Sequence, residues 1–302
     1  MIVVTSGKRY IDIDAYASCV AYRDFLRLQG KDAVAVTGSV INESVAPSLR
    51  ELAGFDDYAF LGDEEFVVLD LSNPDFLDEC VDIEKIVELI DHHAGFEDYW
   101  DDKVRRVQIE KIGAVATIVF ERYRDGGALG KLRPGLAKLL MAAILDNTLN
   151  FKAKITTERD VAAYKELMKI TGEDDGFAEK YFLECQAEVE RDLATAIRND
   201  VKSEKVDFAL PETIAQLLCW DGKEFLRRED ELRNILSGLS ENWMMNLISL
   251  KDGRSYVLVS GDMVAKEALR LFGGVREGDV VILDEVWLRK EILKRALEDA
   301  GK

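Results

Sequence analysis

The first half of the chain alternates between two patterns of hydrophobic and polar positions. Runs of β-branched and other apolar residues at 2–5, 32–40 and 66–71 are typical of buried strands, and the run at 83–90 leads into Asp91. Elsewhere, apolar residues recur at the three- and four-residue spacing of an amphipathic helix. This spacing predicts helices at residues 14–28, 44–52, 113–122, 135–149, 158–170 and 177–198.

Strands that alternate with helices favour a parallel sheet covered by helices on both faces. We therefore expect an α/β fold for residues 1–190, and we expect the long helix 177–198 to lead towards a second domain. In such sheets, ligands bind at the carboxyl ends of the strands, so the polar residues that follow each apolar run are candidates for a site.

The pattern restarts after a linker at residues 191–206. Short apolar runs again alternate with helical periodicity, and Asp252-Gly253 between two such runs is a strong hairpin signal. We predict a smaller α/β domain at residues 207–302. Its predicted strands are 213–219, 246–250, 255–259 and 280–284, and its predicted helices are 223–236, 263–271 and 288–297.

Composition and charge narrow the class of protein. No apolar run approaches the ~20 residues that cross a bilayer, and the chain opens on a strand-like run, so we expect neither a membrane span nor a secretory leader. Four cysteines without a Cys-x-x-Cys pair indicate reduced thiols and a cytoplasmic location. A net charge of −18 disfavours binding of a nucleic acid polymer, but it permits a small polyanion held by metal ions.

Carboxylates follow the predicted strands at several points. Asp12 and Asp14 stand after the first strand, and Asp70 lies at the end of the run 66–71. All would gather at one rim of a parallel sheet, where carboxylates suit divalent ions. The alternatives are that Asp12 and Asp14 cap the next helix and that Asp70 forms an Asx-turn before Pro74.

Both histidines of the chain stand side by side, as His92 and His93, directly after Asp91. Imidazole and carboxylate together suit ions such as Mn²⁺, Co²⁺ or Zn²⁺, while carboxylate-rich sites also take Mg²⁺. The alternative is ordinary polarity at the end of a strand. Asp146 lies near the end of the helix 135–149, where a carboxylate opposes the helix dipole unless a cation lies beside it. A plain helix end is the alternative there.

Two divalent ions about 3.5–4 Å apart can share a hydroxide and clamp the oxygens of an in-line displacement at phosphorus. Such chemistry also needs positive side chains near the phosphate oxygens. The candidates are His93, Lys202, Arg289 and Lys290. Arg289 and Lys290 also fit a solvated basic face of the last helix.

These residues together resemble the DHH phosphoesterase superfamily, and most closely its family II (manganese-dependent) inorganic pyrophosphatases and short-chain exopolyphosphatases. Residues 7–14 resemble the motif Gly-His-x-Asn-Pro-Asp-x-Asp, Asp70 stands in the second motif, and residues 91–93 are the Asp-His-His that names the superfamily. Residues 112–117 resemble the glycine–threonine helix start that follows this third motif, and residues 143–152 with 156–157 resemble the fourth motif. Residues 200–202 resemble the start of a DHHA2-like domain, and residues 286–290 resemble its Ser-Arg-Lys-Lys-Gln motif.

The resemblance implies a role for each of these residues. The ligands of the first ion would be Asp12 and Asp70. The ligands of the second ion would be Asp14, Asp70, His92 and Asp146. Asp91 would orient a histidine ring, and the groups facing the phosphates, between the two domains, would be His93, Lys202, Arg289 and Lys290. Two ions per chain are implied, Mn²⁺ or Mg²⁺, with Co²⁺ also suitable.

The chain departs from the family at positions that bear on the metals and the substrate. Lys8 stands where the pyrophosphatases have a ligating His, which indicates Mg²⁺ preference, or one tight ion only, or a lysine that binds substrate phosphate. In the fourth motif either Asp146 or Asn147 matches the metal position, and we take Asp146 because a carboxylate binds a divalent ion better than an amide. The segment 286–290 lacks the Ser, the second Lys and the Gln, which suggests a different or larger substrate.

We therefore expect a metal-dependent hydrolase that cleaves phosphoanhydride bonds of pyrophosphate or short polyphosphate. One alternative is a small-nucleotide phosphodiesterase, favoured if Tyr10, Tyr16 and Trp243 line the cleft. Another is a non-catalytic regulator in which Lys8 has replaced one ion. The relation to homodimeric pyrophosphatases hints at a homodimer.

Overall fold

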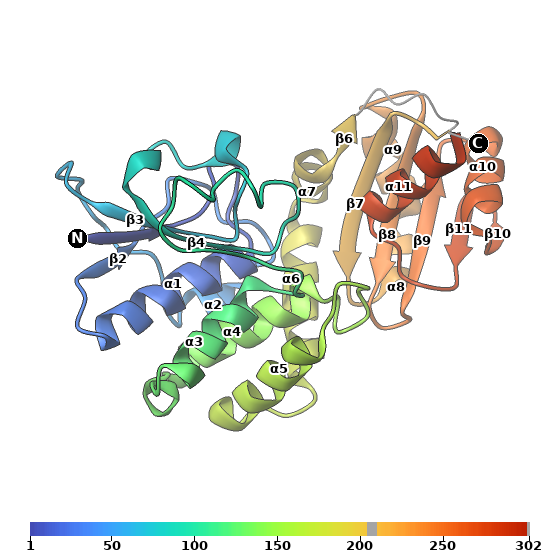
Figure 1. The fold of residues 1–302 in the computed structure, drawn as a ribbon. Coiled ribbons are helices and arrows are strands. Elements are labelled where there is room, and N and C mark those ends of the chain that lie inside the picture. The colour runs from blue at the N-terminus through green and yellow to red at the C-terminus, as the bar shows by residue number, and fades with distance from the viewer. Residues whose placement is uncertain (204–209, 301–302) are drawn as a thin grey trace. The chain divides into compact units, whose positions relative to one another are not determined.

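The computed structural model describes residues 1–203 and 210–300. The chain divides into two compact units, Met1–Tyr181 and Phe182–Lys302, and each is built on a sheet of its own (Figure 1). Helix α6 (Phe177–Arg191) begins in the first unit and ends in the second. None of the helices in the described ranges is both long enough and apolar enough to cross a membrane.

The first unit is built on a five-stranded parallel sheet in the order β2-β1-β3-β4-β5. Its strands are β1 (Ile2–Thr5), β2 (Ala33–Ala35), β3 (Glu65–Leu69), β4 (Ile86–Asp91) and β5 (Val107–Ile109). This confirms the predicted α/β fold with a parallel sheet. β2 is shorter than the predicted run 32–40, and β5 was not predicted, because only three half-buried residues form it.

Helices cover one face of this sheet. α1 (Ile13–Leu28) contacts β1, β2 and β3, and it packs against α3 (Val115–Asp125) and α4 (Pro134–Asn147). α5 (Glu158–Thr171) lies against α3 and α4, so these helices form one layer (Figure 1). The predicted helix 44–52 is reduced to the single turn of α2 (Pro47–Arg50).

The opposite face of the sheet is covered by turns. Val68 and Leu89 from the strands pack with Leu77 and Trp100, which lie in the connections that follow β3 and β4. Trp100 is fully buried, and its indole Nε1 donates to Ser72 O at 2.8 Å. Short 3-10 turns in this unit are Pro74–Phe76, Ile83–Lys85 and Leu129–Lys131.

The predicted helix 177–198 is two helices, so that prediction was wrong. α6 ends at Arg191, and α7 (Leu193–Asp200) starts again after Asp192. Asp192 has φ −140° and accepts a hydrogen bond from Thr195 N at 3.1 Å, which makes it the N-cap of a new helix. The apolar periodicity continues through this break, because the two helices bury neighbouring residues in one core.

The second unit is built on a six-stranded sheet in the order β10-β11-β9-β8-β7-β6, in which only β7 and β8 are parallel. Its strands are β6 (Lys202–Ser203), β7 (Thr213–Cys219), β8 (Trp243–Ser249), β9 (Arg254–Val259), β10 (Val275–Glu277) and β11 (Val280–Leu283). Its helices after α7 are α8 (Gly222–Leu226), α9 (Glu229–Ser237), α10 (Asp262–Phe272) and α11 (Arg289–Ala300).

Most of this second unit agrees with the elements predicted from its sequence. The hairpin at Asp252-Gly253 joins β8 and β9, and Gly253 takes the left-handed φ of 65° that such a turn needs. The predicted helix 223–236 is divided into α8 and α9, and β10 was not predicted. Each face of the sheet buries its own hydrophobic cluster, one around Trp243 and Phe225 and the other around Val257 and Ile292.

Candidate metal centre

Two neighbouring strands of the first unit end in carboxylates. Asp91 is the last residue of β4, and Asp70 directly follows β3 with a left-handed φ of 58°. A non-glycine residue in this conformation costs roughly 1–2 kcal/mol, although Asp tolerates it better than most residues. The backbone N–H of Asp70 donates to Ile90 O at 2.9 Å, which ties the turn to the adjacent strand. Both carboxylates are thus held at the carboxyl edge of the sheet.

Asp70 lies beside the two histidines. Ligand atoms of Asp70, His92 and His93 come within 4.8 Å of one another. Asp70 Oδ1 is 3.4 Å from His92 Nε2 and 3.8 Å from His93 Nδ1. Among the described residues, no donor makes a hydrogen bond to this buried oxygen. An unsatisfied buried acceptor costs roughly 1–3 kcal/mol and more when charged, so a cation here would stabilise the site.

The ring of His92 is oriented for ligation through Nε2. Its Nδ1 lies 3.0 Å from Ile112 O, which can only accept, so Nδ1 carries the proton and Nε2 the lone pair. Burial, and then the charge of His93, lower the pKa of His92 and favour the neutral ring that a metal ligand needs.

The separation between His92 and Asp70 fits a shared cation. His92 Nε2 and Asp70 Oδ1 are two electron-rich atoms 3.4 Å apart, which repel each other unless a positive charge lies between them. Ligand atoms about 2.1 Å from one divalent ion lie roughly 3.0–3.4 Å from each other. The donor set, one carboxylate and one imidazole, suits Mn²⁺ and similar ions.

Asp91 holds the neighbouring ring. Its Oδ1 lies 2.8 Å from His93 Nδ1 and accepts the backbone N–H groups of His92 at 2.7 Å and His93 at 3.2 Å. Desolvation lowers the pKa of His93, but the hydrogen bond and the charge of Asp91 outweigh it and raise that pKa above its ordinary value. The side chain of His93 is 60% exposed. With Nδ1 engaged by Asp91, the nitrogen of His93 that remains for a ligand is Nε2.

Asp14 is fully buried in the first turn of α1 and is surrounded by donors. Its Oδ2 accepts from Val115 N at 2.8 Å and from Asn147 Nδ2 at 2.5 Å. Its Oδ1 accepts from Ala116 N at 2.8 Å and from Ser18 Oγ at 3.2 Å. Desolvation by burial, and then the charge of Asp12, raise the pKa of Asp14 to about 7, against the effect of these donors.

Asp12 caps α1, which is the role that the sequence offered as the alternative to metal ligation. Its Oδ1 accepts from Ala15 N at 3.0 Å. The charge of Asp12 also contributes to the raised pKa values of Asp14, Asp70 and Asp146, after the larger effect of burial. Asp12 is therefore an electrostatic neighbour of the other predicted ligands as well as a helix cap.

The last turn of α4 places Asp146 and Asn147 in different surroundings. Asp146 Oδ1 lies 3.0 Å from the hydroxyl of Tyr181, and burial raises the pKa of Asp146 to about 7 although Tyr181 lowers it. Asn147 donates to Asp14, as given above. Of this pair, the residue that contacts Asp14 is thus Asn147, which the sequence offered as the alternative. No pattern in the sequence pointed to Tyr181.

The lysines that were predicted to face the phosphates are exposed where the structure describes their side chains. Lys8 is exposed, and its backbone N–H donates to Phe76 O at 2.9 Å. Lys290, in the second unit, is exposed at the start of α11. The side chain of Lys202 lies outside the part of the chain that the structure describes, while its backbone in β6 pairs with Ile214.

Arg289 is engaged inside the second unit. Its guanidinium Nη1 lies 2.8 Å from Asp200 Oδ2, and its Nη2 lies 3.2 Å from Asp200 Oδ1. Nη1 also donates to Asp200 O at 2.5 Å and to Ile214 O at 3.3 Å. The backbone N–H of Arg289 donates to Gln216 Oε1 at 2.6 Å, and the residue is only 9% exposed. Arg289 therefore joins α11 to the end of α7, and it is not a solvated side chain of a basic face.

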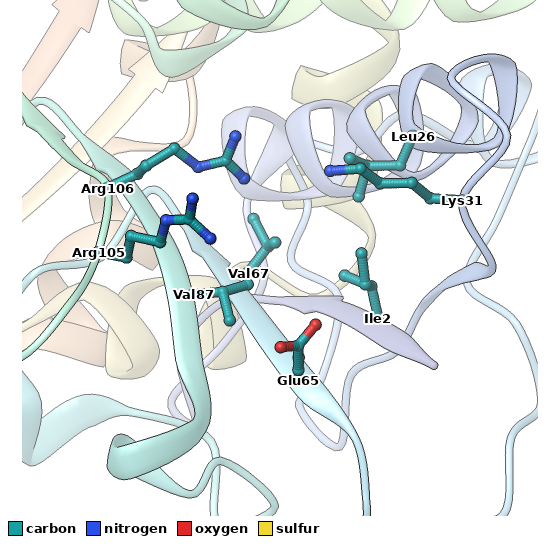
Figure 2. Close-up of a pocket in the computed structure, with 8 residues that line it drawn as sticks. All are labelled: Ile2, Leu26, Lys31, Glu65, Val67, Val87, Arg105 and Arg106. Atoms are coloured by element: carbon teal, nitrogen blue, oxygen red, sulfur yellow. The ribbon is translucent and has the colours of Figure 1, made fainter.

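A separate cavity of about 310 Å³ lies at the opposite end of the parallel strands, near their first residues. Figure 2 shows Arg105 and Arg106 reaching towards it, with Lys31 and Glu65 on its other sides. Arg106 is paired with the buried Glu88 at 2.9 Å. This cavity shares no residue with the carboxylates and histidines described above, so the candidate centre is elsewhere.

The chain is similar in sequence to known proteins over most of its length. Residues 2–144 match the DHH family, N-terminal domain. A probable manganese-dependent inorganic pyrophosphatase of Bacillus cereus is 30% identical over 255 residues, covering 81% of this chain and 80% of the relative.

Two solved structures share the fold over nearly the whole chain. A Methanococcus jannaschii protein classed with the family II inorganic pyrophosphatases has a TM-score of 0.65 at 22% identity, covering 99% of each chain. An exopolyphosphatase-related protein from Bacteroides fragilis has a TM-score of 0.51 at 16% identity, covering 99% of this chain and 91% of the other. At these identities the likeness establishes the two-part fold alone.

Proposed function

We propose that this chain, which belongs to the DHH family, is a metal-dependent hydrolase of phosphoanhydride bonds that acts on pyrophosphate or short polyphosphate. The observation that carries the proposal is the buried Asp70 Oδ1, which faces His92 Nε2 at 3.4 Å and accepts no hydrogen bond from the described residues. The relative that is 30% identical is named as manganese-dependent, which supports Mn²⁺ as the ion here.

The residues at the carboxyl edge of the parallel sheet would serve two purposes, binding the ion and binding the substrate. Asp70 and His92 would hold the ion, with Asp12 nearby, and a bound divalent ion would supply Lewis acidity and a more acidic water. His93 is exposed and keeps Nε2 for a ligand, while Asp91 fixes its ring. Because Asp91 favours the protonated form of His93, this ring can donate a hydrogen bond to a phosphoryl oxygen and stabilise the charge that develops there.

The basic residues that the sequence predicted to contact phosphate are also part of this proposal. Lys8 in the first unit and Lys202 and Lys290 in the second would add positive charge at the substrate. Arg289 would serve the same site, either directly after leaving Asp200 or by holding the start of α11 in place. Mg²⁺ and Co²⁺ stay as alternative ions.

The structure does not favour the nucleotide alternative. Of the three aromatic residues that would stack a base, Tyr16 and Trp243 are buried at 2% exposure each, and only Tyr10 is exposed. Tyr16 forms part of the α1 packing with Phe55, and Trp243 lies in the core of the second unit. Phosphate groups alone are thus the better substrate class for this site.

The test is release of phosphate from pyrophosphate and from tripolyphosphate, with Mn²⁺, Co²⁺ and Mg²⁺ supplied separately. We expect turnover of at least one of the two substrates, fastest with Mn²⁺. Absence of turnover with every ion, in protein that binds Mn²⁺, would point to the non-catalytic regulator instead.

A further inference from the structure

The cavity at the opposite end of the parallel strands has the size and the lining of a binding site. Its volume of about 310 Å³ falls within the range of roughly 300–1,000 Å³ that is usual for small-molecule sites. Its apolar lining consists of Ile2, Val67 and Val87 from β1, β3 and β4, together with Leu26 near the end of α1. The remaining lining residues are charged.

Three positively charged side chains meet at this cavity. Figure 2 shows the guanidinium groups of Arg105 and Arg106 next to each other, and it shows the ammonium group of Lys31 pointing towards them from α1's side. Among the described residues, no carboxylate pairs with Arg105 or Lys31. Like charges repel, and they are gathered here although the chain as a whole has a net charge of −18. An anion between them would relieve the repulsion.

A buried acid fixes one of these arginines. Glu88 is 2% exposed and lies in β4, which is otherwise apolar up to its last residue. Glu88 Oε2 lies 2.9 Å from Arg106 Nη2 and accepts a hydrogen bond from the Tyr22 hydroxyl at 2.7 Å. A buried carboxylate is costly unless it is paired, and the proposed hydrolysis needs none at this end of the sheet. We interpret Glu88 as the residue that holds Arg106 at the cavity.

The strand that carries this acid is irregular at the same point. Phe66 pairs with Ile86, but Val67 pairs with Glu88, so Val87 is an extra residue in β4. Bulges are rare in parallel pairs, and they re-aim side chains near functional sites. This bulge places Val87 in the lining of the cavity and Glu88 within reach of the arginine that it holds.

We propose that this cavity binds a phosphate monoester with an apolar organic part. The phosphate lies among Arg105, Arg106 and Lys31, because guanidinium groups offer paired N–H donors to phosphate oxygens. The organic part lies on the aliphatic lining. Figure 2 shows the carboxylate of Glu65 set apart from the three positive head groups, where it can accept a hydrogen bond from a hydroxyl or amino group of the ligand. The site shares no residue with the candidate metal centre.

The test is isothermal titration calorimetry of the whole chain, freed of metal with a chelating resin. The probes are phenyl phosphate and the four nucleoside 5′-monophosphates, with inorganic phosphate and phenol as the two parts of a monoester taken alone. We expect at least one monoester to bind with a Kd below about 1 mM, and at least tenfold more tightly than inorganic phosphate or phenol.

Variants place the bound ligand in the cavity. Arg105→Ala and Lys31→Ala should each weaken monoester binding at least tenfold, and both positions are exposed, so the fold should be kept. Arg124→Ala is the matched control, because it removes the same charge from an exposed position of the first unit outside the cavity. Arg124→Ala and Asp70→Asn should both bind the monoester as wild type does.

The proposal would be overturned if none of the monoesters bound with a Kd below about 1 mM. An affinity that either Arg105→Ala or Lys31→Ala left unchanged would do the same, because the ligand would then lie elsewhere. Inorganic phosphate that bound as tightly as every monoester would overturn the assignment of an organic ligand. Because the titration needs neither metal nor turnover, a failure of pyrophosphate hydrolysis would leave its result standing, and a failure to bind monoesters would leave the proposed hydrolysis standing.

Discussion

Asp160 lies outside the candidate centre, yet replacing it should loosen the start of α3, which holds Asp14. This carboxylate is fully buried in α5. It accepts from Gly113 N at 3.0 Å and from Thr117 Oγ1 at 2.6 Å, which fixes the start of α3. It also accepts from Thr157 N at 2.8 Å as part of the capping box of α5. The start of α3 in turn supplies the two backbone amides that bind Asp14.

The magnitude follows from what Asp160→Ala leaves behind. Two buried donors, Gly113 N–H and the Thr117 hydroxyl, would lose their acceptor, and each costs roughly 1–3 kcal/mol when left unsatisfied. Loss of half of the capping box adds about 0.5–2 kcal/mol. Some of these donors would regain water in the space that is left. We therefore expect a loss of about 3–5 kcal/mol in the free energy of unfolding of the first unit.

The assay is urea unfolding of the metal-free chain, followed by hydrogen–deuterium exchange in α3 and α5 so that the first unit is measured alone. Glu158→Gln is the matched control, because Glu158 is exposed on the same turn of α5, and it should change stability by less than about 0.5 kcal/mol. A loss below about 1 kcal/mol for Asp160→Ala would refute the reasoning that this carboxylate carries the start of α3.

Three further predictions concern other parts of the chain. Desolvation raises the pKa of Asp56, but the hydrogen bond from Ala35 N and the guanidinium of Arg23 outweigh it and lower this pKa below its ordinary value. The ionised carboxylate therefore stabilises the fold above pH ~4, and this stability is lost as the pH falls through the lowered pKa. Asp56→Asn should thus lower the free energy of unfolding by about 1–2 kcal/mol at pH 7, and by progressively less below pH ~4, as measured by urea unfolding. An equal loss at pH 7 and below pH ~4 would contradict this. Arg289→Ala should destabilise the second unit by about 2–4 kcal/mol and leave Mn²⁺ content unchanged, whereas loss of Mn²⁺ by metal analysis would argue against its placement. Gly113→Ala should lower stability and weaken the α3 start, because its Cβ would lie 2.6 Å from Thr148 Cγ2, and a melting temperature equal to wild type would show that the contact relaxes.

The parts of the fold that the sequence predicted well are those where one periodicity dominates. β1, β3 and β4 are mostly apolar and mostly buried, and this is why the sequence alone places Asp70 and Asp91 at the ends of β3 and β4. The break at Asp192 could not be predicted, because both helices continue the same apolar spacing and only the backbone turn separates them.

The limits at the site have a similar physical origin. Neighbouring residues on a helix point about 100° apart, so the spacing of apolar positions cannot decide whether Asp146 or Asn147 faces Asp14 when the end of the helix is uncertain by a residue. The partner of Arg289 was out of reach for a different reason: Asp200 is 89 residues away along the chain, and only the pairing of β6 and β7 beside α11 brings the two together.

The central claim is that Asp70 organises a metal centre that hydrolyses phosphoanhydrides. The most direct measurement is bound Mn²⁺ per chain together with phosphate release from pyrophosphate, for wild type, Asp70→Asn and the exposed control Asp75→Asn. The account predicts that Asp70→Asn loses its bound Mn²⁺ and at least a hundredfold of the activity at the same time, while Asp75→Asn keeps both. Full Mn²⁺ content and full turnover in a folded Asp70→Asn variant would contradict it.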